Sequence, residues 1–169
     1  DFSDIDTSTA LGALVAHLDI DHGYEMAAGA ALRCWLDAIL VADSESARKI
    51  LHRLESRRDL AVRLVAVDAG AAAPPSPSPG KGEFLMDHVR GSEAVSPAIR
   101  RMIGNVLGAD SLDTVPSPVP EGLAYVTRGG SLIRGDGCME FWATDARARD
   151  PLSRQYALAN AKARLGAIE

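Results

Sequence analysis

A proline-rich segment, PPSPSPG at residues 74–80, divides the chain into two parts of similar length. Four prolines within six residues exclude a helix interior and a central strand, because proline fixes φ and lacks a backbone N–H group. We therefore predict an exposed linker at residues 73–82. The chain on either side is expected to form one lobe, at residues 10–72 and at residues 83–145.

The two parts resemble one another at low sequence identity. LVAHL at residues 14–18 aligns with LMDHV at residues 85–89 at an offset of 71 residues. Further along, ILVAD at residues 39–43 aligns with VLGAD at residues 106–110 at an offset of 67 residues. Chance similarity between short apolar patterns is the alternative interpretation. A true internal repeat predicts two pseudo-symmetric small lobes with a mixed α/β (α+β) fold.

Helical and strand patterns alternate within the first lobe. Apolar residues at helical spacing predict a helix over residues 24–36, and a continuous apolar run predicts a buried strand at residues 38–42. Asp43 and the serine after it are expected to cap a helix over residues 44–56, and residues 62–67 form a β-rich run. In the second lobe, short strands broken by turns are predicted at residues 123–127, 131–133 and 138–142.

Both ends of the chain carry residues at alternating steps of three and four. These are Phe2, Ile5 and Thr9 at the start, and Leu158, Ala161, Leu165 and Ile168 at the end. Asp150 followed by Pro151 is a typical helix start. We expect residues 1–9 and 150–169 to be the ends of two coiled-coil arms, between which the lobes are inserted.

The composition restricts the class of protein. A hydrophobic fraction of 47% predicts a soluble globular domain, and a formal net charge of −5 disfavours a generally basic nucleic-acid-binding protein. Two cysteines without a CxxC pair are typical of a reducing cytoplasm and give no zinc motif. No apolar run approaches the roughly 18 residues that a membrane-spanning helix needs.

The segment TRGGSLIRGDGCMEFW at residues 127–142 contains four glycines within nine positions. A phosphate-binding loop is disfavoured, because the GxxxxGK[ST] spacing is absent and CMEFW is β-like rather than helical. Two interpretations stay open. Either these glycines let another backbone approach closely, or they are turn glycines.

Other chemical sites have little support in the sequence. HLDIDH at residues 17–22 has no recognised metal-ligand spacing, so a solvated acidic turn is favoured over a metal site. No hydrolase, metalloprotease or kinase signature occurs. Cys34 is expected to be a buried, inert thiol rather than a nucleophile.

The predicted helix over residues 44–56 continues into a strongly basic stretch. Its basic residues are Arg48, Lys49, Arg53, Arg57 and Arg58. Lys49, Arg53 and Arg57 fall on one helical stripe that is suited to binding phosphates without sequence preference. The alternative is a solvated face whose cations complement the carboxyl-terminal end of the helix dipole.

Taken in order, these segments resemble the hinge domain of structural maintenance of chromosomes (SMC) proteins. Residues 10–51 are similar to the first-lobe pattern of that family, including a Tyr24–Glu25 pair and Asp43 at the end of a strand. Residues 84–113 resemble the opening of its second lobe. AYVTRGGSLIRGDG at residues 124–137 resembles its closing strand–glycine–strand portion, although Glu140, Phe141 and Trp142 stand near the place of a second glycine pair.

The resemblance implies a non-enzymatic dimerisation domain that joins two SMC subunits, most simply as a homodimer, in a complex that organises and condenses chromosomes. The implied dimer interface consists of Gly129, Gly130, Ser131, Ile133, Gly135, Gly137 and Met139. It also implies weak DNA binding without sequence preference, which we assign to Lys49, Arg53, Arg57 and Arg58. No cofactor, metal, small-molecule substrate or membrane is implied. The ATP sites would lie on the head domains of a full-length cytoplasmic, nucleoid-associated ATPase.

The competing hypothesis is a small α/β enzyme or ligand-binding domain. The molar mass in solution separates the two, since a hinge is expected near twice 17.8 kDa.

Overall fold

The computed structural model describes residues 9–55, 61–70 and 82–141. Apart from Thr9 and Gly82, the predicted coiled-coil segments and the predicted linker lie outside these residues, as do Arg57, Arg58 and Trp142. Within the described residues, the chain forms three α-helices and three small sheets. The predicted mixed α/β fold is therefore confirmed.

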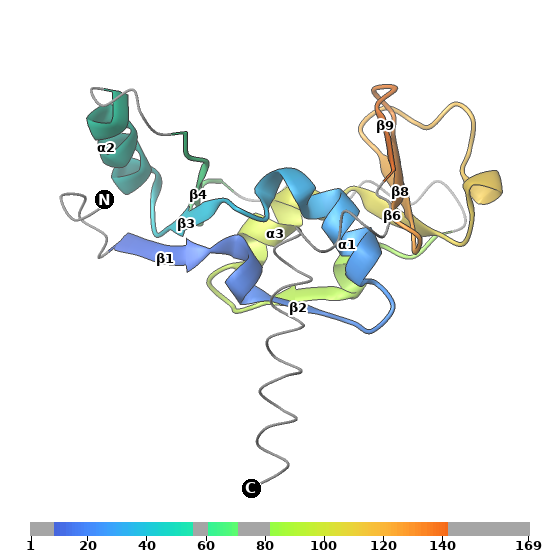
Figure 1. Ribbon diagram of the computed structural model, residues 1–169, viewed down its shortest axis with the longest axis horizontal. Helices are drawn as coiled ribbons and strands as arrows, with labels where there is room; N and C mark the ends of the chain where they lie inside the picture. The colour runs from blue at the N-terminus through green and yellow to red at the C-terminus, as the bar shows by residue number, and fades with distance from the viewer. Residues whose placement is uncertain (1–8, 56–60, 71–81, 142–169) are drawn as a thin grey trace, which may run out of the picture.

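Two of the sheets lie at opposite ends of the molecule (Figure 1). The first is built from β1 (Ala10–Ala13), β3 (Ile39–Val41) and β4 (Leu64–Ala66), in the order β1-β3-β4. The second is built from β6 (Val106–Ala109), β7 (Ala124–Thr127), β8 (Ser131–Arg134) and β9 (Met139–Phe141), in chain order. In each sheet two strands pair in parallel, β3 with β4 and β6 with β7.

Between these two sheets, β2 (Leu18–Ile20) pairs antiparallel with β5 (Val89–Gly91). Asp19 lies opposite Arg90, the residue 71 positions later, so the pair is symmetric about its own centre. Helix α1 (Glu25–Leu32) and helix α3 (Ser96–Ile103) follow the two strands at the same offset, from 25 to 96 and from 32 to 103. The internal repeat is therefore real and forms a pseudo-two-fold arrangement around β2 and β5.

The two halves share one hydrophobic core, and one helix crosses from the first half to the second. Helix α1 comes from the first half but packs against β7 and β8 of the second half, as Figure 1 also shows. The main core cluster joins buried residues of both halves, among them Leu14, Leu32, Ile99 and Leu132. Burial of apolar area across the halves is the main stabilising contribution, since each half alone would expose these side chains.

Local sequence signals explain where the helices begin and end. Helix α2 (Ser44–Glu55) is capped as predicted, because the Asp43 carboxylate accepts hydrogen bonds from the Ser46 backbone N–H at 2.6 Å and from its hydroxyl at 2.9 Å. The helix predicted over residues 24–36 ends earlier, at Leu32, and continues as a 3₁₀ turn. That turn tightens the chain before β3, where the Ala38 N–H donates to the Trp35 carbonyl at 2.9 Å.

An arginine on α3 ties the second half to the end of the first sheet. The Arg101 guanidinium donates to the carbonyl of Ala66 at 2.8 Å and to that of Gly70 at 3.0 Å, with a longer contact to Val67. The side chain is half-buried, so these bonds are only partly replaceable by water.

We predict that Arg101→Ala lowers the free energy of unfolding by about 1–3 kcal/mol, because at least one partly buried carbonyl loses its donor. Urea denaturation followed by circular dichroism measures this change. Arg100→Ala is the matched control, since Arg100 is exposed on the same helix. Equal stability of the two variants would contradict a structural role for Arg101.

Candidate functional site

The outer edges of the two end sheets differ in how they are covered. At β6, the Gly108 N–H donates to the Glu83 carbonyl at 2.7 Å, and Phe84 forms a bridge with Leu107. At β1, the Leu11 carbonyl is bonded by the His17 ring at 2.7 Å. At β4, the last outward carbonyl is taken by Arg101. Exposed sheet edges are sites where another chain can add, and these three are partly or wholly blocked.

The outer edge of β9 is open among the described residues. The Arg134 N–H bonds the Cys138 carbonyl at 2.9 Å, so the alternation of pairs in an antiparallel ladder turns the backbone groups of Met139 and Phe141 outward. Their side chains are 72% and 69% exposed. An open strand edge with two exposed apolar side chains is typical of a surface that another protein covers.

Met139 ends an apolar row that crosses the second sheet. The row runs through the cross-strand partners Leu107, Tyr125, Ile133 and Met139. Leu107 and Tyr125 are buried, Ile133 is half-buried and Met139 is exposed. The hydrophobic cluster on this face of the sheet therefore continues to the open edge. On the opposite face Glu140 lies 3.8 Å from Arg33.

The four glycines lie in the turns of the β7–β8–β9 hairpins, and three of them have an intrachain explanation. Gly130 is buried with φ +90°, and a Cβ atom there would lie 3.3 Å from the Met26 Cε atom of α1. A Cβ atom on Gly135 would overlap the Pro120 carbonyl. Gly137 has a φ of +87°, which strains any other residue, although no atom lies within 4 Å of the position of its Cβ. Gly129 lies in the same turn as Gly130. Turn geometry and close packing thus account for Gly130, Gly135 and Gly137, and contact of any of the four glycines with a partner stays a prediction.

The predicted basic stripe begins on α2 as expected, but one of its cations, Lys49, is paired with an acidic residue of the same helix. Lys49 Nζ lies 2.6 Å from Glu45 Oε1, and this hydrogen bond raises the pKa of Lys49. Arg48, Lys49 and Arg53 are exposed. Part of the stripe is thus engaged in a surface ion pair of the kind expected for a solvated face.

Cys34 was expected to be buried, and this prediction is wrong. It lies exposed on the 3₁₀ turn Arg33–Trp35, where the chain leaves α1 and the apolar face of the helix has ended. Cys138, at the start of the β9 hairpin arm, is also exposed, and partial desolvation, helped by Glu140, raises the pKa of its thiol. A raised pKa makes a thiol less reactive as a nucleophile.

The residues of HLDIDH do not converge on one point. His17 bonds the Leu11 carbonyl, and His22 lies 3.2 Å from Glu25. Among the described residues, no group of three or more His, Cys, Asp or Glu side chains is placed to hold a metal ion.

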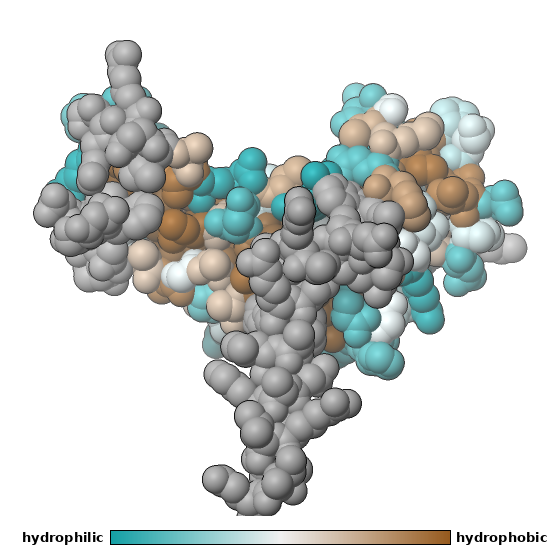
Figure 2. Space-filling view, in the orientation of Figure 1, coloured by the Kyte–Doolittle hydropathy of each residue, from teal (hydrophilic) through white to brown (hydrophobic). Residues whose placement is uncertain are grey.

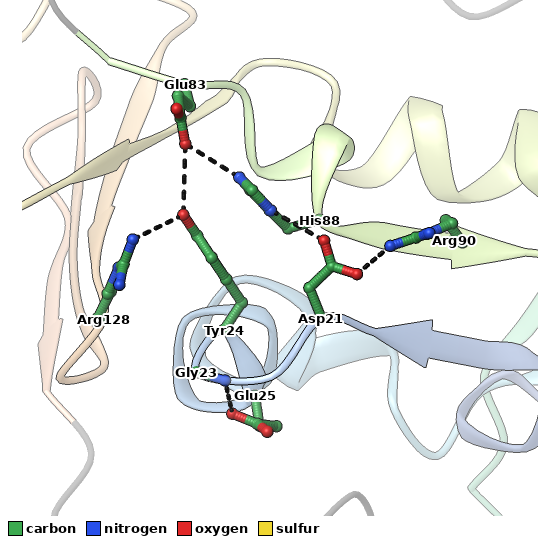
Figure 3. Close-up of polar contacts among 8 residues, drawn as sticks. All are labelled: Asp21, Gly23, Tyr24, Glu25, Glu83, His88, Arg90 and Arg128. Atoms are coloured by element: carbon green, nitrogen blue, oxygen red, sulfur yellow. Dashed lines mark hydrogen bonds and ion pairs between the residues drawn. The ribbon is translucent and has the colours of Figure 1, made fainter.

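Asp21 instead belongs to a polar cluster that the sequence did not reveal (Figure 3). The cluster joins residues of both halves, namely Asp21, Tyr24, Glu83, His88, Arg90 and Arg128. The Tyr24 ring stacks on His88 at 3.7 Å between centroids, and the Arg128 guanidinium lies 4.7 Å from the Tyr24 ring centroid. The one available signal was the repeat itself, because it brings residue 88 next to residue 21 at the end of the β2–β5 pair.

The cluster holds its carboxylates ionised. Hydrogen bonds from Arg90, and then from His88, lower the pKa of Asp21 below its ordinary 3.8. Hydrogen bonds from His88 and then Tyr24 lower the pKa of Glu83 below its ordinary 4.5. Next to the cluster, Tyr24, Glu83 and Arg128 line a cavity of about 590 Å³, together with Gly108 and Thr114.

We predict that Asp21→Asn destabilises the protein at neutral pH and that the difference from wild type shrinks in acid. A lowered folded pKa stabilises the fold above 3.8, and this contribution is lost as the pH falls through the folded value. Urea midpoints at several pH values between about 2 and 7 measure it.

Asp113→Asn, at an exposed aspartate in the 3₁₀ turn Leu112–Thr114, is the control and should leave the midpoint nearly unchanged. A pH-independent effect of Asp21→Asn would show that its charge does not stabilise the fold.

Comparison with known proteins agrees with this geometry. A family model of the flexible hinge domain of SMC proteins matches residues 7–115. Of the solved structures, an asymmetric dimer of the Geobacillus stearothermophilus SMC hinge domain has a TM-score of 0.75 at 21% identity, over 94% of this chain and 68% of that chain. The Pyrococcus furiosus SMC hinge domain has a TM-score of 0.71 at 17% identity, over 83% of this chain and 76% of that chain.

A second Pyrococcus furiosus structure, a hinge with an extended coiled coil, has a TM-score of 0.67 at 18% identity. This chain is covered over 94% of its length and spans 61% of that one. A search among curated proteins found no significant match. No helix in the described part of the chain is long and apolar enough to cross a membrane.

Proposed function

Because this chain belongs to the SMC hinge family, a non-catalytic dimerisation domain, we propose that it joins two identical SMC subunits through the open edge of β9. The observation that carries this proposal is the pair of exposed side chains, Met139 and Phe141, on a strand whose outward backbone groups have no partner among the described residues. Adding a partner strand would satisfy these groups and bury both side chains.

We propose β4 of the partner as the strand that meets β9. These two strands lie at opposite ends of the molecule (Figure 1), and Figure 2 shows apolar side chains exposed at both ends. On β4, the ladder with β3 turns the backbone groups of Leu64 and Ala66 outward, and Arg101 takes only the Ala66 carbonyl. Two β9–β4 contacts related by a two-fold axis would close a dimer and leave neither edge open.

The full-length protein would carry coiled-coil arms and head domains that hydrolyse ATP. We place it in the cytoplasm with the nucleoid, where it would organise, condense and segregate chromosomes. The support for this wider role is family membership alone.

We predict that Met139→Glu combined with Phe141→Glu converts the dimer to a monomer, because two buried carboxylates would face an apolar edge without partners. Sedimentation equilibrium should then give a mass near 17.8 kDa rather than twice that value.

Leu112→Glu is the matched control, because Leu112 is also an exposed apolar residue, at 52%, but belongs to the 3₁₀ turn Leu112–Thr114 and not to β9. The control should stay dimeric, and circular dichroism should be unchanged in both. A dimeric β9 variant would rule out this interface. Glutamate at Gly135 is a poor test, since any side chain there overlaps Pro120 within the same chain.

We further propose weak DNA binding by the exposed basic residues of α2. The support is their exposure on one helix at one end of the molecule, away from β9. The net charge of −5 opposes approach to DNA, so dissociation constants should be about 10⁻⁶ M or weaker at physiological salt.

We predict that Lys49→Gln with Arg53→Gln weakens binding to duplex DNA and reduces the slope of log K against log salt by about 1–2, since each phosphate contact contributes about 0.9. Fluorescence anisotropy at several salt concentrations measures this slope. Arg100→Gln, at an exposed arginine of α3, serves as the control. An unchanged slope in the α2 variant would identify the stripe as a solvated face.

A further inference from the structure

Each end sheet has one face on the shared core and one outer face, and a helix covers the outer face of the first sheet only. There, helix α2 packs beside β3 and β4 (Figure 1). Its buried residues Ile50 and Leu54 form a cluster with Val41 of β3. Leu64 and Ala66 of β4 are partly buried against the same cluster, so the side chains of β4 on this face lie under α2.

The second sheet has no matching helix, since the described chain after β6 forms only the 3₁₀ turn Leu112–Thr114. The residues that follow this turn provide a smaller cover, with Val115 and Val119 packed in the cluster over β6 and β7. This cover does not extend to β9, where Met139 and Phe141 are 72% and 69% exposed. The outer face of the second sheet therefore has a bare apolar strip along β9.

The direction in which β9 meets β4 of a partner decides whether α2 and this strip lie on the same side. Leu64 and Ala66 turn their backbone groups to the outer edge of β4, as Met139 and Phe141 do on β9. In an antiparallel pair, residues that bond one another lie directly opposite, and their side chains project from the same face. An antiparallel β9–β4 pair thus joins the two outer faces, whereas a parallel pair would bring Glu140 under α2.

One flank of α2 is turned toward the outer edge of β4. Ser44, the first residue of the helix, donates to the Asp68 carboxylate beyond β4 from its backbone N–H at 2.9 Å and from its hydroxyl at 3.0 Å. Leu51 lies on the same flank, because seven residues make about two turns. These turns bring it about 10 Å back along β4, near the level of Leu64. Its side chain is 44% exposed.

We propose that Leu51 of α2 packs on Phe141 of the partner subunit, so that the helix of one subunit covers the bare strip of the other. A pair centred on Val65 and Glu140 places Leu64 opposite the partner's Phe141, at the level of Leu51. This contact rests on the dimer proposed above, to which it adds the antiparallel direction, the face and the helix. A two-fold axis repeats the contact, so each subunit both gives and receives a covering helix.

The test is a double-mutant cycle on the dimer dissociation constant, measured by sedimentation equilibrium over a range of protein concentrations. Leu51→Glu and Phe141→Lys should each raise this constant by about 100-fold or more, because each puts an unpaired charge into an apolar contact that forms twice. With both changes in one chain, the new carboxylate faces the new ammonium group across the joint. The double variant should then dimerise at least about tenfold more tightly than the product of the two single effects predicts.

His52→Glu is the matched control, because His52 is the next residue of α2, has a 90% exposed side chain and receives the same new charge. It should leave the dissociation constant nearly unchanged and should not compensate for Phe141→Lys. Leu51→Ala with Phe141→Ala repeats the cycle without new charges, and circular dichroism checks that every variant is folded.

The outcomes separate this contact from the interface on which it rests. A Phe141→Lys variant that stays fully dimeric shows that the β9 interface is wrong, and the α2 contact is overturned with it. If Phe141→Lys weakens the dimer but neither Leu51 variant does, the β9 interface stands and the α2 contact is overturned. Additive effects in both cycles overturn the contact as well.

Discussion

The antiparallel pairing of β2 with β5 is the contact on which the rest of the structure depends. It joins residues that lie 71 positions apart at its centre, Asp19 and Arg90, and it places the two halves about a pseudo-two-fold axis. Once this pair forms, α1 reaches the second sheet and Arg101 of α3 reaches the end of the first. The main core then takes side chains from both halves. A three-residue pair cannot be stable alone, so its stability must come from the apolar area that the shared core buries around it.

The sequence predicted the features that depend on local chemistry. The Asp43 cap, helix α2 and the strands that carry the repeat follow from capping, amphipathic periodicity and apolar runs, all of which act over a few residues. It did not predict β1, β2 or β5, because each of these strands is only three or four residues long, too short for a periodic pattern to be recognised. The cluster around His88 was equally hidden, since its members converge only through the β2–β5 pairing.

The glycine-rich segment shows how one pattern can have two physical explanations. Close approach of a second backbone was expected to require Gly130 and Gly135, yet Met26 and Pro120 of the same chain already occupy the space beside them. Bare backbone is thus needed to fold the hairpins, whatever contacts them from outside. The side chains that face outward are those of Met139 and Phe141, at the end of this segment. They lie beyond residue 115, where the match to the hinge family ends. The support for the proposed interface therefore comes from the open edge of β9 in this chain, and not from the family match.

The core shared by the two halves also determines where a hinge dimer of this kind would separate. Pulling the two halves of one chain apart would expose the shared core, break the β2–β5 pair and remove α1 from β7 and β8. Parting β9 from the proposed partner strand would expose only the apolar side chains and backbone groups of one pair of three-residue strands. Because the free-energy cost of opening grows with the apolar area exposed, separation would occur between subunits before it occurs within one. Each subunit would then stay folded while the joint opens, and a ring of two edge contacts would open at one contact while the other still holds the pair together.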